Sequence, residues 1–181
     1  MLCLSTRQDL NRDSVETLIS SIIAAHGGQI MEMVVFSDDP DKPYGREVLF
    51  QDAHLELLVT GWKRGRHCWP HTHGPSSEGT VFVLAGTGTF QTFSSVRNGF
   101  VACPAIRLTA GQNVFVPRRE IHAMGTDEEE RLVCLHAYWP PVTEMLVYDP
   151  PLEHAWRVSG GGAWRPELKD ILEHRSTADG M

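Results

Sequence analysis

The chain has 181 residues, of which 41% are hydrophobic and 22% are charged, and its formal net charge is −7. This balance predicts a globular chain with one sizeable core, and it argues against nucleic-acid binding, which needs a basic surface. No apolar run is long enough to cross a bilayer, so no membrane partner is expected. The absence of a signal peptide and of any Cys-x-x-Cys pair predicts a cytoplasmic protein whose cysteines are free thiols. These cysteines are Cys3, Cys68, Cys103 and Cys134.

Residues 1–43 are predicted to form a helical flank. Asp13 and Glu16 stand three residues apart, the spacing of a capping box. Apolar residues then recur at helical spacing over residues 15–23, and the Gly27-Gly28 pair is expected to end the helix.

Residues 44–149 contain short apolar or alternating runs, such as LELLVTGW, TVFVLAG and RLVCLHAYW, separated by turn residues. This pattern predicts an antiparallel β-sandwich or barrel. Residues 150–181 form a C-terminal extension, with a turn-rich SGGGAWRP segment and a short helix expected near residues 167–174. We therefore predict an all-β fold in one domain, residues 1–181.

Two histidines lie two residues apart in the segment WPHTHG, as His71 and His73. In an extended strand such residues point to the same face, so both imidazoles can reach one point. A third histidine, His122, follows in GQNVFVPRREIHAMG. The two segments together resemble the two motifs of the cupin superfamily, a β-barrel of the jelly-roll type. The matching positions are Gly65, His71, His73 and Glu78 in the first motif, and Gly111, Pro117 and His122 in the second.

Within the cupins, the chain is similar to the cysteine dioxygenase family from Tyr44 to Asp149. The segments that carry this resemblance are KPYGREVLF, WKRGRHCWPHTHG, the second cupin motif and LVCLHAYWPPVTEMLVYD, in family order. The resemblance implies a mononuclear Fe(II) centre on His71, His73 and His122. It also implies L-cysteine bound through its thiolate and amine, and transfer of both atoms of dioxygen to sulfur, which yields cysteine sulfinic acid. The same three imidazoles also suit nickel or zinc.

Cys134, His136 and Tyr138 alternate along one predicted strand and therefore share a face, while Val133 and the other intervening residues share the opposite face. The resemblance implies that the Tyr138 hydroxyl lies near substrate and that His136 hydrogen-bonds to it. Cys134 replaces the family serine at the start of this relay, and a thiol is a weaker hydrogen-bond partner.

Tyr44 and Arg46 match the family pair that holds the substrate carboxylate, for which a guanidinium offers two parallel hydrogen bonds. Arg46 favours L-cysteine, because related 3-mercaptopropionate dioxygenases generally carry glutamine there. Glu78 is expected not to be a ligand. Gly79 aligns with the cysteine that mammalian members cross-link to the active-site tyrosine, so no cross-link is expected here.

Three alternatives stay open at this stage. The first is a dioxygenase of another small thiol, such as 3-mercaptopropionate. The second is a metal-binding cupin without catalysis, serving as a sensor or binding module. The third is a general cupin in which Glu78 completes the metal shell. The oligomeric state is also left open.

Overall fold

The computed structural model describes residues 10–97 and 99–177, and Cys3 lies outside this part of the chain. The described residues form one α-helix, α1 (Arg12–Glu32), a 3₁₀ turn at Leu168–Asp170 and twelve strands. The strands are β1 (Tyr44–Gln51), β2 (Glu56–Trp62), β3 (His71–Thr72), β4 (Glu78–Val96), β5 (Gly99–Ala102), β6 (Ile106–Thr109), β7 (Asn113–Val116), β8 (Ile121–Gly125), β9 (Leu132–Trp139), β10 (Met145–Tyr148), β11 (His154–Val158) and β12 (Ile171–Ser176). No helix in these described ranges is long and apolar enough to span a membrane.

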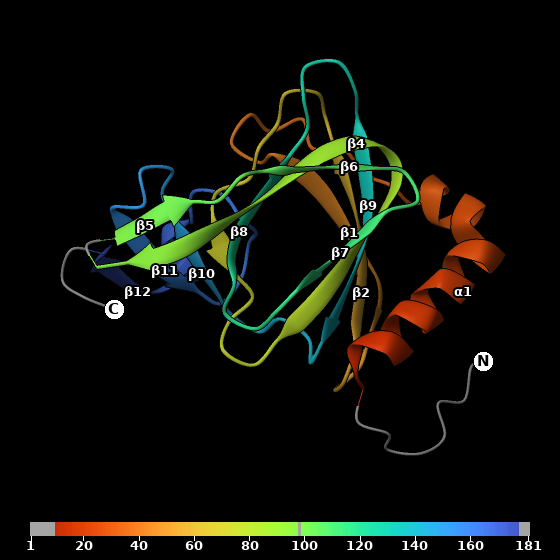
Figure 1. The fold of residues 1–181 in the computed structure, drawn as a ribbon, viewed down its shortest axis with the longest axis horizontal. Helices are drawn as coiled ribbons and strands as arrows, with labels where there is room; N and C mark the ends of the chain where they lie inside the picture. The colour runs from red at the N-terminus through yellow and green to blue at the C-terminus, as the bar shows by residue number, and fades with distance from the viewer. Residues whose placement is uncertain (1–9, 98, 178–181) are drawn as a thin grey trace.

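The strands pair antiparallel in the order β1-β2-β9-β4-β8-β3-β10-β11-β12, with β5, β6 and β7 joined to β4. The first half of β4 pairs with β9 and β7, and its second half pairs with β8 and β6. β4 therefore belongs to both halves of a jelly-roll-like arrangement (Figure 1). The predicted all-β fold is confirmed, although the sheet is not closed into a complete barrel.

Strand β4 changes course at a glycine. The register with β9 shifts between Val83 and Ala85, and Gly86 follows with a φ of 77°. A Cβ at Gly86 would collide with the backbone of Arg131, so this close approach of β4 to the start of β9 requires glycine.

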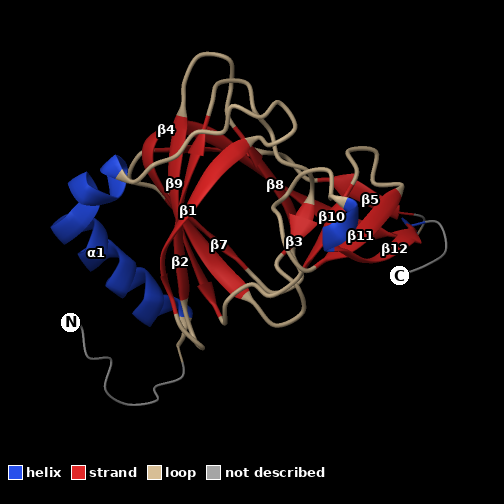
Figure 2. Cartoon of the chain, turned by 180° about the vertical axis from the view of Figure 1, so that it is seen from behind, coloured by secondary structure: helices blue, strands red, loops and turns tan. Residues whose placement is uncertain are grey.

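The two faces of β9 have different roles, as the alternation predicts. Its outward side chains join the helix in one apolar cluster, which contains Val133, Leu135, Ala137, Val15 and Ile19. His136 and Tyr138 point the other way and line a cavity. Figure 2 shows α1 on the outer side of this part of the sheet, away from the strands β10, β11 and β12.

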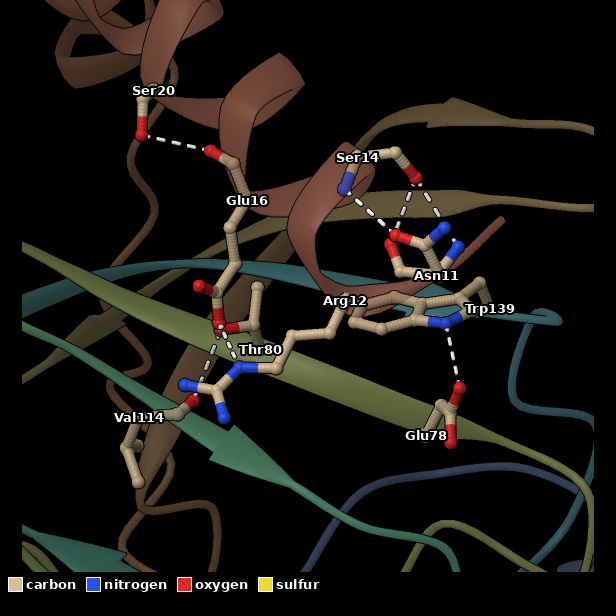
Figure 3. Close-up of polar contacts among 9 residues, drawn as sticks. All are labelled: Asn11, Arg12, Ser14, Glu16, Ser20, Glu78, Thr80, Val114 and Trp139. Carbon is tan, nitrogen blue, oxygen red and sulfur yellow. Dashed lines mark hydrogen bonds and ion pairs between the residues drawn. The ribbon is translucent and has the colours of Figure 1, made fainter. Parts of the chain in front are cut away.

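The helix α1 differs from the prediction at both ends. Its capping box uses Asn11 and Ser14, whereas the predicted Glu16 accepts hydrogen bonds from Arg12 Nε at 2.9 Å and Thr80 Oγ1 at 3.2 Å, which ties α1 to β4 (Figure 3). The helix also continues through Gly27-Gly28 to Glu32. Burial of Ile30 against the core offsets the roughly 1 kcal/mol that a helical glycine costs relative to alanine.

The predicted C-terminal helix near residues 167–174 is wrong. Only the 3₁₀ turn at Leu168–Asp170 is helical there, and residues 171–176 form β12, which pairs with β11. His174 lies opposite Trp156 in this pairing, and the two rings stack at 5.1 Å between centroids. Cross-strand contacts of this kind stabilise a short segment as a strand even where its own sequence favours a helix.

Candidate metal centre and its cavity

The three predicted histidines meet inside the fold. His71 lies on β3 and pairs with His122 on β8, and His73 follows two residues after His71. All three side chains are buried, and one ligand nitrogen from each lies within 4.8 Å of the others. The pairing of β3 with β8 therefore brings together the two histidine-containing segments that the sequence predicted to share a metal site.

Backbone carbonyls orient two of these rings. His71 Nδ1 lies 3.0 Å from the carbonyl oxygen of Trp69, and His122 Nδ1 lies 3.1 Å from that of Glu120. Donation by Nδ1–H leaves Nε2 of each ring with a free lone pair, which is the arrangement of a metal-ligating imidazole. His73 Nδ1 is buried and has no hydrogen-bond partner in the described part of the chain. Protein groups alone therefore do not meet the hydrogen-bonding capacity of the His73 ring.

Burial keeps these imidazoles uncharged. Desolvation lowers the pKa of His71 from 6.5 to about 4 and holds the pKa values of His73 and His122 well below 6.5. Neutral imidazole is the form that binds a metal ion, so this trio fits a divalent cation in its donor type and its protonation state.

Glu78 does not join the three histidines. Its carboxylate accepts a hydrogen bond from Trp139 Nε1 at 2.9 Å (Figure 3) and lies 3.4 Å from Arg118 Nε. His67 is also outside the cluster, because its ring packs against Gly125.

A chain of hydrogen bonds ends beside the trio at Tyr138. The Tyr138 ring lies 4.5 Å from that of His73, and its hydroxyl lies 3.0 Å from His136 Nδ1. His136 Nε2 lies 3.0 Å from Thr60 Oγ1, which also accepts a hydrogen bond from Trp62 Nε1. Because Thr60 Oγ1 already accepts from Trp62 Nε1, its hydroxyl proton is available to His136 Nε2.

This assignment sets the direction of the remaining bonds. With Nε2 accepting, His136 carries its proton on Nδ1 and donates it to the Tyr138 oxygen. Burial lowers the pKa of His136 to about 3 and raises that of Tyr138 well above 10, so both groups stay neutral. Tyr138 therefore keeps its own O–H proton free for a molecule in the cavity.

Cys134 takes no part in this chain, which corrects the expected relay. Its thiol makes no hydrogen bond to any described residue and packs in an apolar cluster with Trp62 and Val83. The cross-strand neighbour of Cys134 is Thr60, and the Thr60 hydroxyl takes the place beside His136. Burial raises the pKa of the Cys134 thiol, which keeps it protonated.

Tyr44 and Arg46 also face the cavity, but both already have partners. The Tyr44 hydroxyl accepts a hydrogen bond from the backbone N–H of Ala163 at 2.9 Å. Arg46 donates through Nη1 to the carbonyl oxygen of Gly161 at 3.1 Å and through Nη2 to Glu56 Oε1 at 3.3 Å. The structure thus places the predicted carboxylate-binding pair beside a buried acidic residue.

The cavity has a volume of about 300 Å³, and the three histidines lie on its wall. Sequence reasoning missed three of its polar residues, all on β2: Glu56, Thr60 and Trp62. The run ELLVTGW could have indicated them, because a glutamate and a threonine interrupt an otherwise apolar run. Alternate residues of a strand share a face, so these two polar side chains point to the same side.

No family model matches this chain. Among solved structures, it is similar to an uncharacterized conserved protein with a double-stranded β-helix domain from Klebsiella pneumoniae, at 16% identity, over 64% of this chain and 90% of that one, with a TM-score of 0.53. An oxalate oxidase in complex with the substrate analogue glycolate matches at 14% identity, over 68% of this chain and 62% of that one, with a TM-score of 0.54. The chain therefore shares the double-stranded β-helix fold, and it carries a three-histidine group that could hold a metal ion.

Proposed function

We propose that this protein is a mononuclear non-haem iron(II) thiol dioxygenase that converts L-cysteine and dioxygen into cysteine sulfinic acid. The observation that carries this proposal is the meeting of three neutral, buried imidazoles with a protonated tyrosine hydroxyl in one cavity. The resemblance of four segments to the cysteine dioxygenase family supports the same reaction. The reaction is balanced without a further reductant, because both oxygen atoms are transferred to one sulfur.

His71, His73 and His122 would hold the iron. Three neutral ligands leave the full positive charge on the site, which favours an anionic ligand such as a thiolate. The chemistry that ferrous iron supplies when bound is ionisation of the thiol and activation of dioxygen.

The remaining groups bind and orient the substrate. The Tyr138 hydroxyl offers a proton toward the cavity, and His136 fixes its direction by donating to the phenolic oxygen. Arg46 has two of its five N–H donors occupied, so it retains donors for the substrate carboxylate. Leu58, Val81 and other apolar residues complete the wall and limit the access of water to the reacting sulfur.

Metal analysis combined with oxygen uptake tests the proposal. Iron-loaded protein should consume oxygen with L-cysteine, and mass spectrometry should find a product that contains two added oxygen atoms. His122→Ala should lose both iron and activity, whereas His26→Ala, which alters an exposed residue of α1, should retain both.

Two results would overturn the proposal. Iron binding without oxygen uptake on any thiol would favour the binding module. Faster uptake with 3-mercaptopropionate than with L-cysteine would show that Arg46 has been misinterpreted.

A further inference from the structure

Two exposed histidines face each other across the strand pair β11–β12, away from the cavity. His154 begins β11 and His174 lies in β12, and neither belongs to the buried histidine cluster of the candidate metal centre. In the pairing of these strands His174 lies opposite Trp156, two residues along β11 from His154, so the three side chains share one face. The two imidazoles are therefore a second group of metal-ligating side chains.

The separation of the two facing nitrogens fits shared coordination of one metal ion. His174 Nε2 lies 3.3 Å from His154 Nδ1. Two nitrogens that bind one Zn²⁺ at about 2.0–2.1 Å, with a tetrahedral angle between them, are about 3.3–3.4 Å apart. The usual donor–acceptor distance of an N–H···O hydrogen bond is shorter, at about 2.7–3.2 Å. A metal ion can therefore join the two rings with little change in their separation.

Other contacts hold both ligands in place without using these nitrogens. The His174 ring stacks on that of Trp156, with 5.1 Å between the centroids and 18° between the planes. The Asp149 carboxylate accepts a hydrogen bond from the backbone N–H of His154 at 2.9 Å, which fixes the start of β11. Ligands that are already positioned lose less conformational entropy when a metal ion binds.

The charged side chains of the two strands do not oppose a cation at this pair. Arg157, Glu173 and Arg175 alternate with Trp156 and His174 along the strands, so they belong to the opposite face. On that face Glu173 forms ion pairs with both arginines, at 3.4 Å and 2.6 Å. The face that carries the two imidazoles is therefore open to a positively charged ligand.

We propose that His154 and His174 form a second binding site for a divalent transition-metal ion, separate from the three buried histidines. The ion takes one nitrogen from each ring, and water fills its remaining positions because both side chains are exposed. Imidazole suits Zn²⁺, Ni²⁺ and Cu²⁺, and Cu²⁺ binds most tightly in the general order of these ions. The site does not depend on the dioxygenase reaction.

A metal ion at this site would tie β12 to β11. β12 lies at one end of the described sheet and follows β11 in the strand order. The segment that connects the two strands includes residues 159–162, which line the cavity. Because a ligand stabilises the form that binds it, the ion stabilises the strand pair that carries this part of the cavity wall.

Calorimetric titration of the metal-free protein with Zn²⁺ tests the proposal. The wild-type protein should bind two equivalents, one at the buried cluster and one at the exposed pair. His154→Ala should weaken the second equivalent by about a hundredfold, the order of affinity that a second linked contact adds. His174→Phe should do the same while keeping an aromatic ring against Trp156. His26→Ala removes an exposed imidazole from α1 and should leave both equivalents unchanged.

His122→Ala separates this site from the candidate metal centre. That variant should lose one equivalent and keep the one that depends on His154. If His154→Ala and His174→Phe bind Zn²⁺ like the wild-type protein, the second site is refuted. If uptake depends on His154 and His174 but not on His122, the second site stands and the candidate metal centre fails.

Hydrogen exchange measures the effect on the strands. Zn²⁺ added to His122→Ala should slow amide exchange in β12, because the ion then binds at the exposed pair and opposes local opening of the strand. The double variant His122→Ala/His154→Ala should show no such change. Equal exchange rates in β12 with and without Zn²⁺ in His122→Ala would contradict the stabilisation of this strand pair.

Discussion

Acidification should destabilise the metal-free protein through its buried imidazoles. The pKa of His71 is lowered from 6.5 to about 4 and that of His136 to about 3, and burial also lowers the pKa values of His73 and His122. In the unfolded chain each ring would titrate near its ordinary value of about 6.5. The unfolded state therefore binds more protons below that value. Stability falls as the pH drops from about 6.5 toward the folded pKa values, and it levels off only below them.

The size of this effect follows from the shifts. At about pH 5.5, each buried imidazole lowers the free energy of unfolding by about 1.4 kcal/mol relative to its value above pH 7.5. The four rings together lower it by about 5 to 6 kcal/mol, which is comparable to the roughly 5 to 15 kcal/mol that stabilises a typical domain. Carboxyl groups contribute little in this window, because they titrate mainly below about pH 5 in the unfolded chain.

Urea unfolding of chelator-treated protein, followed by tryptophan fluorescence at several pH values from about 7.5 to 5.5, measures this dependence. Its slope at the acid end should correspond to an uptake of nearly four protons on unfolding. His71→Asn and His136→Asn should each remove about one of these protons. An uptake below about two protons would refute the conclusion that the cavity desolvates these rings.

Three substitutions test other parts of the structure. Thr60→Val removes the donor to His136 and should lower the maximal rate of oxygen uptake about tenfold, with iron content unchanged, whereas Thr60→Ser should retain the rate; equal losses in both would contradict the hydrogen-bond chain. Glu78→Gln should leave the metal content unchanged, since this carboxylate lies outside the histidine cluster, and loss of metal would favour the general cupin. Gly86→Ala should lower the free energy of urea unfolding by about 1 to 3 kcal/mol, because the added methyl group would collide with the backbone of Arg131 and the φ of 77° disfavours a side chain; an unchanged value would contradict this close approach.

The sequence by itself determined the features that depend on neighbouring residues. The alternation along RLVCLHAYW separates an apolar face from a face that carries His136 and Tyr138, and the structure confirms this division. The spacing of His71 and His73 places two imidazoles on one side of an extended segment for the same local reason. Apolar repeats at helical spacing likewise marked the helix α1, although not its ends.

Only the tertiary structure decided which distant segments share the cavity. The register of β2 against β9 sets Thr60 opposite Cys134 and Glu56 opposite Tyr138, and so brings a threonine and a buried carboxylate into a site that the sequence assigned to other residues. The strand at residues 171–176 exists because β11 offers it a hydrogen-bonding edge and Trp156 offers His174 a stacking surface. Pairing of this kind depends on hydrogen bonds and side-chain contacts between segments far apart in the chain, so no local pattern of residues specifies it.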